Sequence, residues 1–507
     1  MSKYVFKTTR NGEIIPALVL PDGNIQPLHS MVDPVKEAER LVATIPQNTD
    51  FLIFLGLGGG FAPLAALKSG TGKVMVIDFD RDGVNELLSS KDYTPLLNNK
   101  RFTLLVNPSE KEIQSFILQN YNPALYGGTS TIPLRTRIEA DTLLFKTAAQ
   151  SIQQAISLVS SDYSAQAHFG KQWFSNIIRN IAYGDPNTHA AITDSIIDEA
   201  AVVAAGPSLD MQITQLAECK ERDVFIICSD TAAGTLLHHG IKPDTIVSID
   251  CQHISYYHFL NCNSHGFLNF LQNIPLILDI ASPPLLASFS VNHTFFSSGH
   301  PLARYINYAL KPMPQLDTSG GNVTYTCISF AEYLGAKRIT LFGADFAYVK
   351  SRTYAKGTYI YPYFEKRQNR LNTLEAQLSA FLYRSPFLSI QGDEEFRETA
   401  QLRFYREKLE QKTGISIVPG SGNPAVISLK NFSRKSGSTA IKKRFNSGAD
   451  FLKQYRKDII SAEQGSEVFT TLLPYAAYLK HRNPNIGTKE LIELTKSSCS
   501  SYISAFV

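Results

Sequence analysis

Two regions of the chain predict α/β sheets from their pattern of apolar positions. In the first, the apolar run Phe51–Leu55 predicts a buried strand, a glycine loop follows, and a helix over 62–68 leads to a second strand over 73–77. The second region predicts strands over 200–205, 224–228, 245–249, 274–279 and 338–342 and helices over 209–219, 231–239 and 322–334. Because a parallel return needs a long crossover, this alternation predicts a parallel, doubly wound sheet.

The segments around these sheets follow other patterns. Short alternating pieces occupy residues 1 to about 45, and Asp33-Pro34 is typical of a helix start. Residues 138–182 follow a helical period, and the chain from 371 is mostly helical. We therefore expect an α/β protein with a Rossmann-like N-terminal domain (1–150), a central doubly wound domain with a helical lead-in (151–370) and a mostly helical C-terminal domain (371–507).

The composition supports this size of protein and narrows its class. At roughly 150 residues per domain, 507 residues correspond to about three domains, and 44% hydrophobic residues are enough for sizeable cores. Lys and Arg total 49 and Asp and Glu total 45, a surplus of +4 that is too small for a non-specific nucleic-acid coat. Nucleic acid is therefore not an expected partner.

Cysteine spacing and the N-terminus bear on metals and location. The six cysteines form no CxxC pair and have no tight spacing with histidine, so no zinc site is predicted. Residues 1–9 carry charges and no apolar core of a signal peptide, and no apolar block reaches the roughly 20 residues that span a bilayer. We expect a cytoplasmic protein with reduced thiols and no membrane insertion.

The sharpest local feature is Ala205-Gly206-Pro207-Ser208-Leu209, where an expected strand stops and a helix begins. Glycine lets a backbone approach closely, and free N–H groups at a helix start favour an anion by about 0.3–1 kcal/mol. A nucleotide phosphate would suit this turn. The alternative is a plain tight turn with Ser208 as the helix cap.

Polar residues also follow the next two strands of the same region. Ser229 and Asp230 come after the second strand, and Asp250 and His253 come after the third. Ligands of open α/β sheets bind outside the carboxyl ends of the strands, so these residues should line one crevice. Individually, Asp230 could instead cap a helix and His253 could be an ordinary surface histidine.

Two further elements belong to this expected crevice. Ser319-Gly320-Gly321-Asn322 precedes a helix and offers a second glycine-supported start, with an amide able to read a ribose or base edge. An ordinary glycine turn is the alternative. The last strand leads to Asp345, which could act as a base, hold a metal or cap a turn.

A basic, tyrosine-dense stretch follows Asp345. It includes Tyr348, Tyr354 and Tyr359, interspersed with Lys and Arg. Tyrosine hydroxyls and cations can hold a departing phosphate if the segment folds over the crevice, so we expect a mobile lid. An exposed loop that grips a partner protein is the alternative.

The first glycine loop carries a weaker signal. Asp78 follows Gly58 by twenty positions, the spacing at which an acid can bind a ribose hydroxyl. A dinucleotide or S-adenosylmethionine site and a Rossmann scaffold without a ligand both fit. We do not place the activity there.

Taken in order, these motifs resemble the motility-associated factor (Maf) family of bacterial flagellin glycosyltransferases, which belongs with the 6-hydroxymethylpterin pyrophosphokinase-like (MptE-like) proteins. The matching stretches are Leu28-His29-Ser30 with Asp33-Pro34 and Glu37-Ala38, residues 169–180 around Trp173, Ala205–Leu209, Ser248-Ile249-Asp250, Ser319–Asn322 and Gly343-Ala344-Asp345. They extend over most of the chain up to about residue 365.

The resemblance implies a central domain similar to bacterial sialyltransferases. The donor would be a CMP-activated nonulosonic acid of the pseudaminic or legionaminic type, and the acceptor Ser or Thr hydroxyls of flagellin. It implies nucleotide binding by Gly206, Pro207, Ser208, Ser229, Asp250 and Asn322. The strand-end and glycine-turn patterns add Asp230, Ser319, Gly320 and Gly321 to the expected nucleotide site. Tyr348 and Tyr359 would hold the leaving phosphate, and a Mg²⁺ requirement stays open.

One departure from the family pattern concerns the general base. Many relatives carry a histidine after the Gly-x-Asp element, where Tyr354 stands here. The catalytic candidates are therefore Asp345, His253 and Tyr354. An MptE-like pyrophosphokinase that uses ATP and magnesium, and a flagellin-binding protein without catalytic activity, are the alternative functions.

Overall fold

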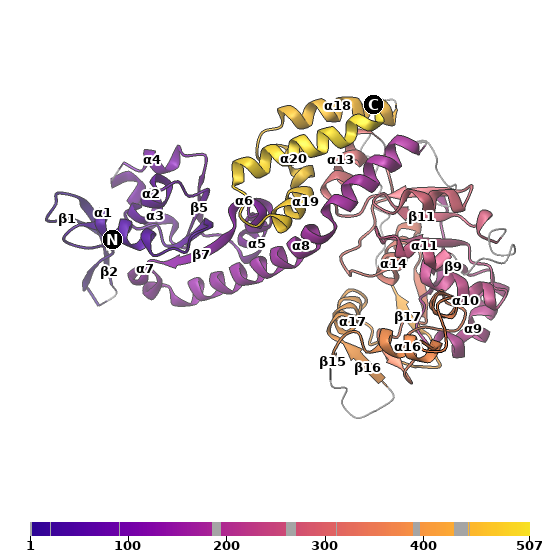
Figure 1. Ribbon diagram of the computed structural model, residues 1–507. Helices are drawn as coiled ribbons and strands as arrows, with labels where there is room; N and C mark the ends of the chain where they lie inside the picture. Colours follow the sequence, from indigo (N-terminus) through magenta and orange to yellow (C-terminus); the bar gives the residue numbers. More distant parts are fainter. Residues whose placement is uncertain are drawn as a thin grey trace. The chain divides into compact units, whose positions relative to one another are not determined.

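The structure is a computed structural model that describes residues 3–20, 22–90, 92–184, 194–259, 270–310, 312–388, 396–429, 445 and 447–507. The chain forms two compact units. The first comprises Met1–Gly170 and Leu473–Thr495, and the second comprises Lys171–Leu472 and Lys496–Val507. Three helices continue from one unit into the other: α8 (Thr142–Tyr183), α19 (Glu467–Arg482) and α20 (Thr488–Ile503) (Figure 1).

The first unit contains two sheets. An antiparallel sheet of β1 (Tyr4–Thr8), β2 (Ile14–Val19) and β3 (Ile25–Pro27) precedes a parallel sheet in the order β6-β5-β4-β7. The parallel strands are β4 (Thr49–Leu55), β5 (Lys73–Asp78), β6 (Phe102–Val106) and β7 (Gly128–Pro133). The helices are α1 (Pro34–Ala43), α2 (Phe61–Lys68), α3 (Arg81–Ser90), α4 (Thr94–Leu97), α5 (Glu110–Asn120), α6 (Pro123–Tyr126) and α7 (Arg135–Ala140).

Alternate residues of β4 enter two different cores. Leu52 and Phe54 pack in one cluster with side chains of α2 and α3, whereas Phe51 and Ile53 pack in another with side chains of α5 and α8. A strand that is covered on both faces must be apolar at successive positions, which explains the unbroken run in the sequence. The predicted Rossmann-like arrangement of this region is confirmed.

The second unit is built on a seven-stranded sheet in the order β12-β11-β10-β9-β8-β13-β17. Its strands are β8 (Glu199–Val203), β9 (Phe225–Ser229), β10 (Thr245–Ser248), β11 (Leu276–Asp279), β12 (His293–Phe296), β13 (Arg338–Phe342) and β17 (Ala425–Ser428). All neighbours pair in parallel except β17, which runs antiparallel to β13. This confirms the predicted doubly wound sheet and adds β12 and β17, which the sequence analysis did not identify.

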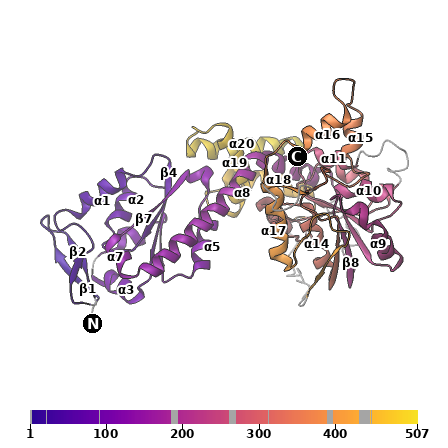
Figure 2. The same cartoon turned by 90° about the horizontal axis from the view of Figure 1, so that it is seen from below.

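Helices and a small sheet complete this unit. The helices are α9 (Leu209–Glu221), η2 (Asp230–Ala232), α10 (Ala233–His238), α11 (Ile254–Phe259), η3 (Pro284–Phe289), α13 (Pro301–Ala309), α14 (Val323–Leu334), α15 (Ile360–Glu365), α16 (Leu374–Leu382), α17 (Ala400–Thr413), α18 (Gly448–Ser461) and η4 (Ser504–Phe506). The small antiparallel sheet consists of β14 (Tyr348–Val349), β16 (Phe396–Thr399) and β15 (Phe387–Leu388). Figure 2 shows β8 between α9 and α14, in agreement with the separate hydrophobic clusters that these helices form on the two faces.

The strand order places a topological switch point at β8. From β8 the chain proceeds outward through β9, β10, β11 and β12, and then returns to the other side of β8 as β13. In open α/β sheets, ligands bind outside the carboxyl ends of the strands at such a point. A ligand site of this sheet would therefore include residues that follow β8, β9, β10 and β13.

The compact units differ from the three domains expected from the sequence. Residues 371–507 are shared between the units, because β17 pairs with β13 and α19 continues into the first unit. The segment is mostly helical, as expected, with the short strands β15, β16 and β17. None of the helices in the described part of the chain is both long and apolar enough to cross a membrane.

Candidate functional site

The turn after β8 is held by residues that follow β13. Gly206 N–H donates to Gly343 O over 2.8 Å, and Ser208 N–H donates to Asp345 Oδ2 over 2.8 Å. A Cβ atom on Gly206 would lie 2.3 Å from Asp345 Oδ2, so only glycine fits against this carboxylate. The glycine of the motif thus serves a contact within the protein.

Asp345 is buried in this contact. It is 2% exposed, and its Oδ1 accepts a second hydrogen bond from Gly420 N–H at 2.7 Å. Burial raises the pKa of Asp345, while the two backbone donors act in the opposite direction. Ser208, itself 2% exposed, makes no side-chain cap bond. A phosphate at residues 206–208 would have to displace Asp345 from the Ser208 N–H, so that role stays a prediction.

The residues after β9 form a closed polar cluster. Asp230, 3% exposed, accepts hydrogen bonds from Ser248 Oγ at 2.7 Å and from Thr231 N–H at 2.6 Å. Its Oδ2 lies 3.2 Å from His258 Nδ1 on α11. Burial alone would raise the pKa of Asp230, but His258 and these donors lower it. The predicted strand-end acid is thus paired with a histidine that the sequence analysis did not single out.

The residues after β10 are more open. Asp250 is partly exposed, and its Oδ1 accepts from Gln252 N–H at 2.9 Å. Burial and the neighbouring Asp230 raise the pKa of Asp250. His253 is exposed, one residue before α11 begins, and its side chain has no hydrogen-bond partner within the described residues.

The Ser319–Asn322 turn supplies the N-terminus of α14. Asn322 is the helix cap, accepting Tyr325 N–H at 3.0 Å through Oδ1, and its amide donates to Gly320 O. By helix geometry, the N–H groups of Val323 and Thr324 precede the intrahelical bonding pattern. This turn therefore presents the free donors that a phosphate needs, and it lies at the carboxyl edge because α14 leads back to the parallel strand β13.

The tyrosine segment is attached to the sheet rather than free of it. Arg352 pairs with Asp210 at 2.6 Å, and Ala355 N–H donates to Ala205 O at 2.9 Å. These bonds anchor the middle of the segment to α9 and to the turn after β8, and the expected lid movement stays a prediction.

Three tyrosines of this segment occupy different places. Tyr359 packs against His258, with ring centroids 4.6 Å apart. The ring centroids of Tyr354 and Tyr359 are 6.3 Å apart. Burial raises the pKa of Tyr354 to about 12 and also raises that of Tyr359, so both hydroxyls keep their protons at neutral pH. Tyr348, in β14, stacks edge-on against Phe387. Tyr359 is therefore the tyrosine in direct contact with the polar cluster after β9.

Amide side chains from α8 fasten two strand ends. Asn176 Nδ2 donates to Cys251 O and Ala281 O, and Asn180 Nδ2 donates to Ile280 O and Ser282 O, all within 3.0 Å. The sequence analysis identified the helix but not this pair. Two asparagines four positions apart on an otherwise apolar face are the signal that could have revealed it.

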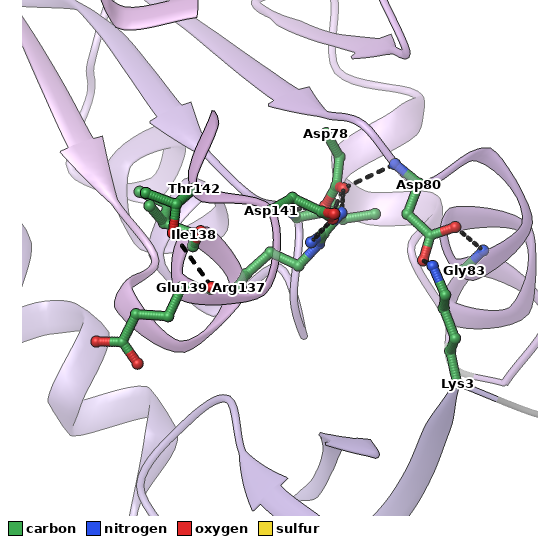
Figure 3. A network of polar contacts seen from close by, with 10 residues as sticks. Lys3, Asp78, Asp80, Gly83, Arg137, Ile138, Glu139, Asp141 and Thr142 are labelled. Atoms are coloured by element: carbon green, nitrogen blue, oxygen red, sulfur yellow. Dashed lines mark hydrogen bonds and ion pairs between the residues drawn. The ribbon is translucent and has the colours of Figure 1, made fainter. Parts of the chain in front are cut away.

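The glycine loop of the first unit contacts the protein's own side chains, among them Asp78, whose contact with Arg137 is shown in Figure 3. Asp78 Oδ2 accepts a hydrogen bond from Leu57 N–H. Asp78 Oδ1 accepts one from Arg137 Nη2 at 2.8 Å. A Cβ atom on Gly56 would meet Arg137 at 2.9 Å, and Gly59 N–H donates to His29. The acid that the sequence analysis considered as a ribose ligand accepts from Arg137 in the structure.

Comparisons with known proteins agree with the motif order. Residues 175–351 match the model of a family described as 6-hydroxymethylpterin diphosphokinase MptE-like. An uncharacterized protein of Treponema pallidum is 32% identical over 187 residues, which cover 34% of this chain and 86% of that relative. The chain belongs to the MptE-like family. A second uncharacterized T. pallidum protein is 36% identical over 126 residues, covering 24% of this chain and 45% of that relative, less than half its length.

A solved structure matches the fold of the whole chain. The Maf glycosyltransferase of Magnetospirillum magneticum AMB-1 matches 100% of this chain and 87% of its own, with a TM-score of 0.54 and 14% identity. At this identity the match shows the fold. The relation to Maf and MptE-like proteins that the motifs predicted is thereby confirmed.

The buried ion pair of the first unit gives a testable consequence. Arg137→Met leaves Asp78 buried without its cation, and breaking a buried pair in this way costs about 3–5 kcal/mol of unfolding free energy. Lys337→Met is the matched control, since Lys337 and Asp198 are 73% and 77% exposed and exposed pairs contribute below about 1 kcal/mol. Denaturant unfolding of both variants measures the difference, and equal losses would contradict the assignment.

A second prediction concerns Asp279, which ends β11 and is 5% exposed. Burial raises its pKa from 3.8 to about 6, so folding favours the neutral form. Wild-type stability should therefore fall between pH 4 and pH 6, as the buried carboxyl ionises, by up to about 3 kcal/mol. Asp279→Asn should lack this fall in urea unfolding at pH 4.5 and 7, and an unchanged pH dependence would refute it.

Proposed function

We propose that this protein is a glycosyltransferase that moves a nonulosonic acid from a CMP donor to Ser or Thr hydroxyls of flagellin in the cytoplasm. The observation that carries the proposal is the set of polar groups at the switch point of the seven-stranded sheet. The fold of the whole chain matches that of a Maf glycosyltransferase. The family match to residues 175–351 covers β8 to β13 and therefore the same groups.

The donor nucleotide would lie across the carboxyl edge of the sheet. The Ser319–Asn322 turn and the start of α14 offer N–H donors for its phosphate. Ser229, Asp230 and Asp250 lie at the next strand ends, where the partly exposed carboxylate of Asp250 can accept from ribose hydroxyls or the cytosine amine. Gly206, Pro207 and Ser208 form the adjoining turn, which Asp345 stabilises.

The reaction needs charge stabilisation more than a covalent intermediate. CMP leaves the anomeric carbon as a phosphate while the protein hydroxyl attacks, so negative charge grows on the phosphate oxygens. Tyr359 keeps its proton because burial raises its pKa, and it could donate to that phosphate, with Tyr348 as the second tyrosine proposed for this role. Burial raises the pKa values of Tyr354 and Tyr359, and the positive charge of Arg384 acts in the opposite direction.

The family description supports a second candidate. An MptE-like diphosphokinase would transfer a diphosphate from ATP to a pterin and would use carboxylates such as Asp230 and Asp250 for magnesium. Native mass spectrometry of the protein with CMP, and with ATP plus Mg²⁺, separates the two. Selective binding of ATP, with no CMP complex, would favour the diphosphokinase.

The proposed function predicts a direct transfer assay. Incubation with CMP-pseudaminic or CMP-legionaminic acid and unmodified flagellin should increase the intact mass of flagellin by one or more nonulosonic acid residues. Release of CMP, followed by chromatography, reports donor cleavage in the same samples. Absence of both products with either donor would refute the proposal.

Tyr359→Phe tests the role of the tyrosine within that assay. Loss of one hydroxyl that stabilises developing charge should lower kcat by about 10²-fold to 10³-fold and leave the thermal midpoint close to wild type. Tyr333→Phe is the matched control, because Tyr333 stacks on Phe330 along α14 and should keep its activity. Equal rates for both variants would remove Tyr359 from the mechanism.

A further inference from the structure

The reaction proposed above needs a group that accepts the proton of the attacking hydroxyl. Of the residues predicted for this task, Asp345 holds Ser208 and Gly420 with its two oxygens, and burial keeps Tyr354 protonated. His253 is exposed and is not oriented by any described side chain. None of the three combines an available lone pair with a fixed position.

His258 combines both properties. Its Nδ1 lies 3.2 Å from Asp230 Oδ2 and 3.4 Å from Thr231 Oγ1, and its side chain is 11% exposed. Asp230 is fixed in turn by Ser248 and Thr231. Hydrogen bonding of Nδ1–H to a carboxylate selects one imidazole tautomer and orients the ring.

The other ring nitrogen is left available. Within the described residues, Nε2 of His258 has no hydrogen-bond partner, so in the tautomer with a proton on Nδ1 its lone pair is unused. The ring packs against Tyr359, which is proposed to hold the leaving phosphate, so base and phosphate ligand are neighbours. A base beside the leaving-group ligand can serve the same substrate complex.

We propose that His258 is the general base of the transfer and that Asp230 is its positioning residue; this inference rests on the proposed function. The acceptor oxygen forms a bond to the anomeric carbon while the bond from that carbon to the phosphate oxygen breaks. The hydroxyl proton moves to Nε2 of His258, and the electron pair of the broken bond leaves with CMP. Asp230 stabilises the imidazolium that results.

Other titratable groups face His258 and bear on pH dependence. They are Asp230 from the end of β9, Asp250 from the end of β10 and Tyr359 from the tyrosine segment. Burial raises the pKa of Asp250, so its carboxyl contributes to the pH dependence as well. A loss of the acidic limb of the rate profile on changing His258 alone, with Asp250 intact, therefore assigns that limb to His258.

The test measures kcat and KM of transfer across pH for wild type, His258→Gln and Asp230→Asn. His258→Gln should lower kcat by about 10²-fold to 10⁴-fold, with the donor KM within a few-fold, and should abolish the acidic limb of kcat. His481 is an exposed histidine on α19, and His481→Gln is the matched control. This variant should keep the wild-type kcat and the acidic limb of its pH profile. His258→Gln with wild-type kcat and profile would overturn the inference.

A spectroscopic measurement tests the role of Asp230 without relying on turnover. Long-range ¹H–¹⁵N spectra of the folded protein should show His258 with its proton on Nδ1, and Asp230→Asn should shift the population toward Nε2–H. An unchanged tautomer in Asp230→Asn would overturn the positioning role.

The same experiments separate the two levels of the proposal. If wild type neither releases CMP nor modifies flagellin, the proposed function fails, and the catalytic role of His258 fails with it. If wild type is active while His258→Gln loses nothing, only the inference fails. Circular dichroism of each variant confirms that a low rate reflects chemistry and not unfolding.

Discussion

The switch point of the large sheet depends on one buried carboxylate. Asp345 joins the turn after β8 to the segment before β17 through backbone N–H groups of Ser208 and Gly420. Gly206 packs directly on the same carboxylate. Since a buried carboxylate is costly unless its oxygens are satisfied, the chain segments around it must keep their positions. The edge of the sheet at this point is therefore fixed by the protein's own contacts.

The acids along this edge divide into two groups with different surroundings. Hydrogen-bond donors and a histidine surround Asp230 and lower its pKa. Burial instead raises the pKa values of Asp250 and Asp279. Environments that separate the pKa values of neighbouring acids also separate their chemical roles. One acid remains charged and can orient a base, and the others exchange protons closer to neutrality.

The sequence predicted the strands and their polar ends but not the partners of those ends. The apolar runs located β8, β9, β10, β11 and β13, because strands covered on both faces have no polar alternation to obscure them. Asp230 was identified because it is the first acid after β9, whose end the apolar run had located. Its partner His258 comes from the helix after the next strand, and a contact of this kind depends on the packed geometry of two crossovers. Arg137 escaped prediction likewise, since a buried arginine is identified only by the acid it meets.

The antiparallel strand β17 has a consequence for how the protein is made. Parallel pairing leaves β13 at one border of the sheet until β17 arrives, and β17 is encoded far downstream of its partner. During synthesis, the backbone groups of β13 stay open to mispairing until Ser428 has left the ribosome. A nascent chain that stalls in the intervening segment thus carries an uncapped sheet, and chaperones would have to shield that border.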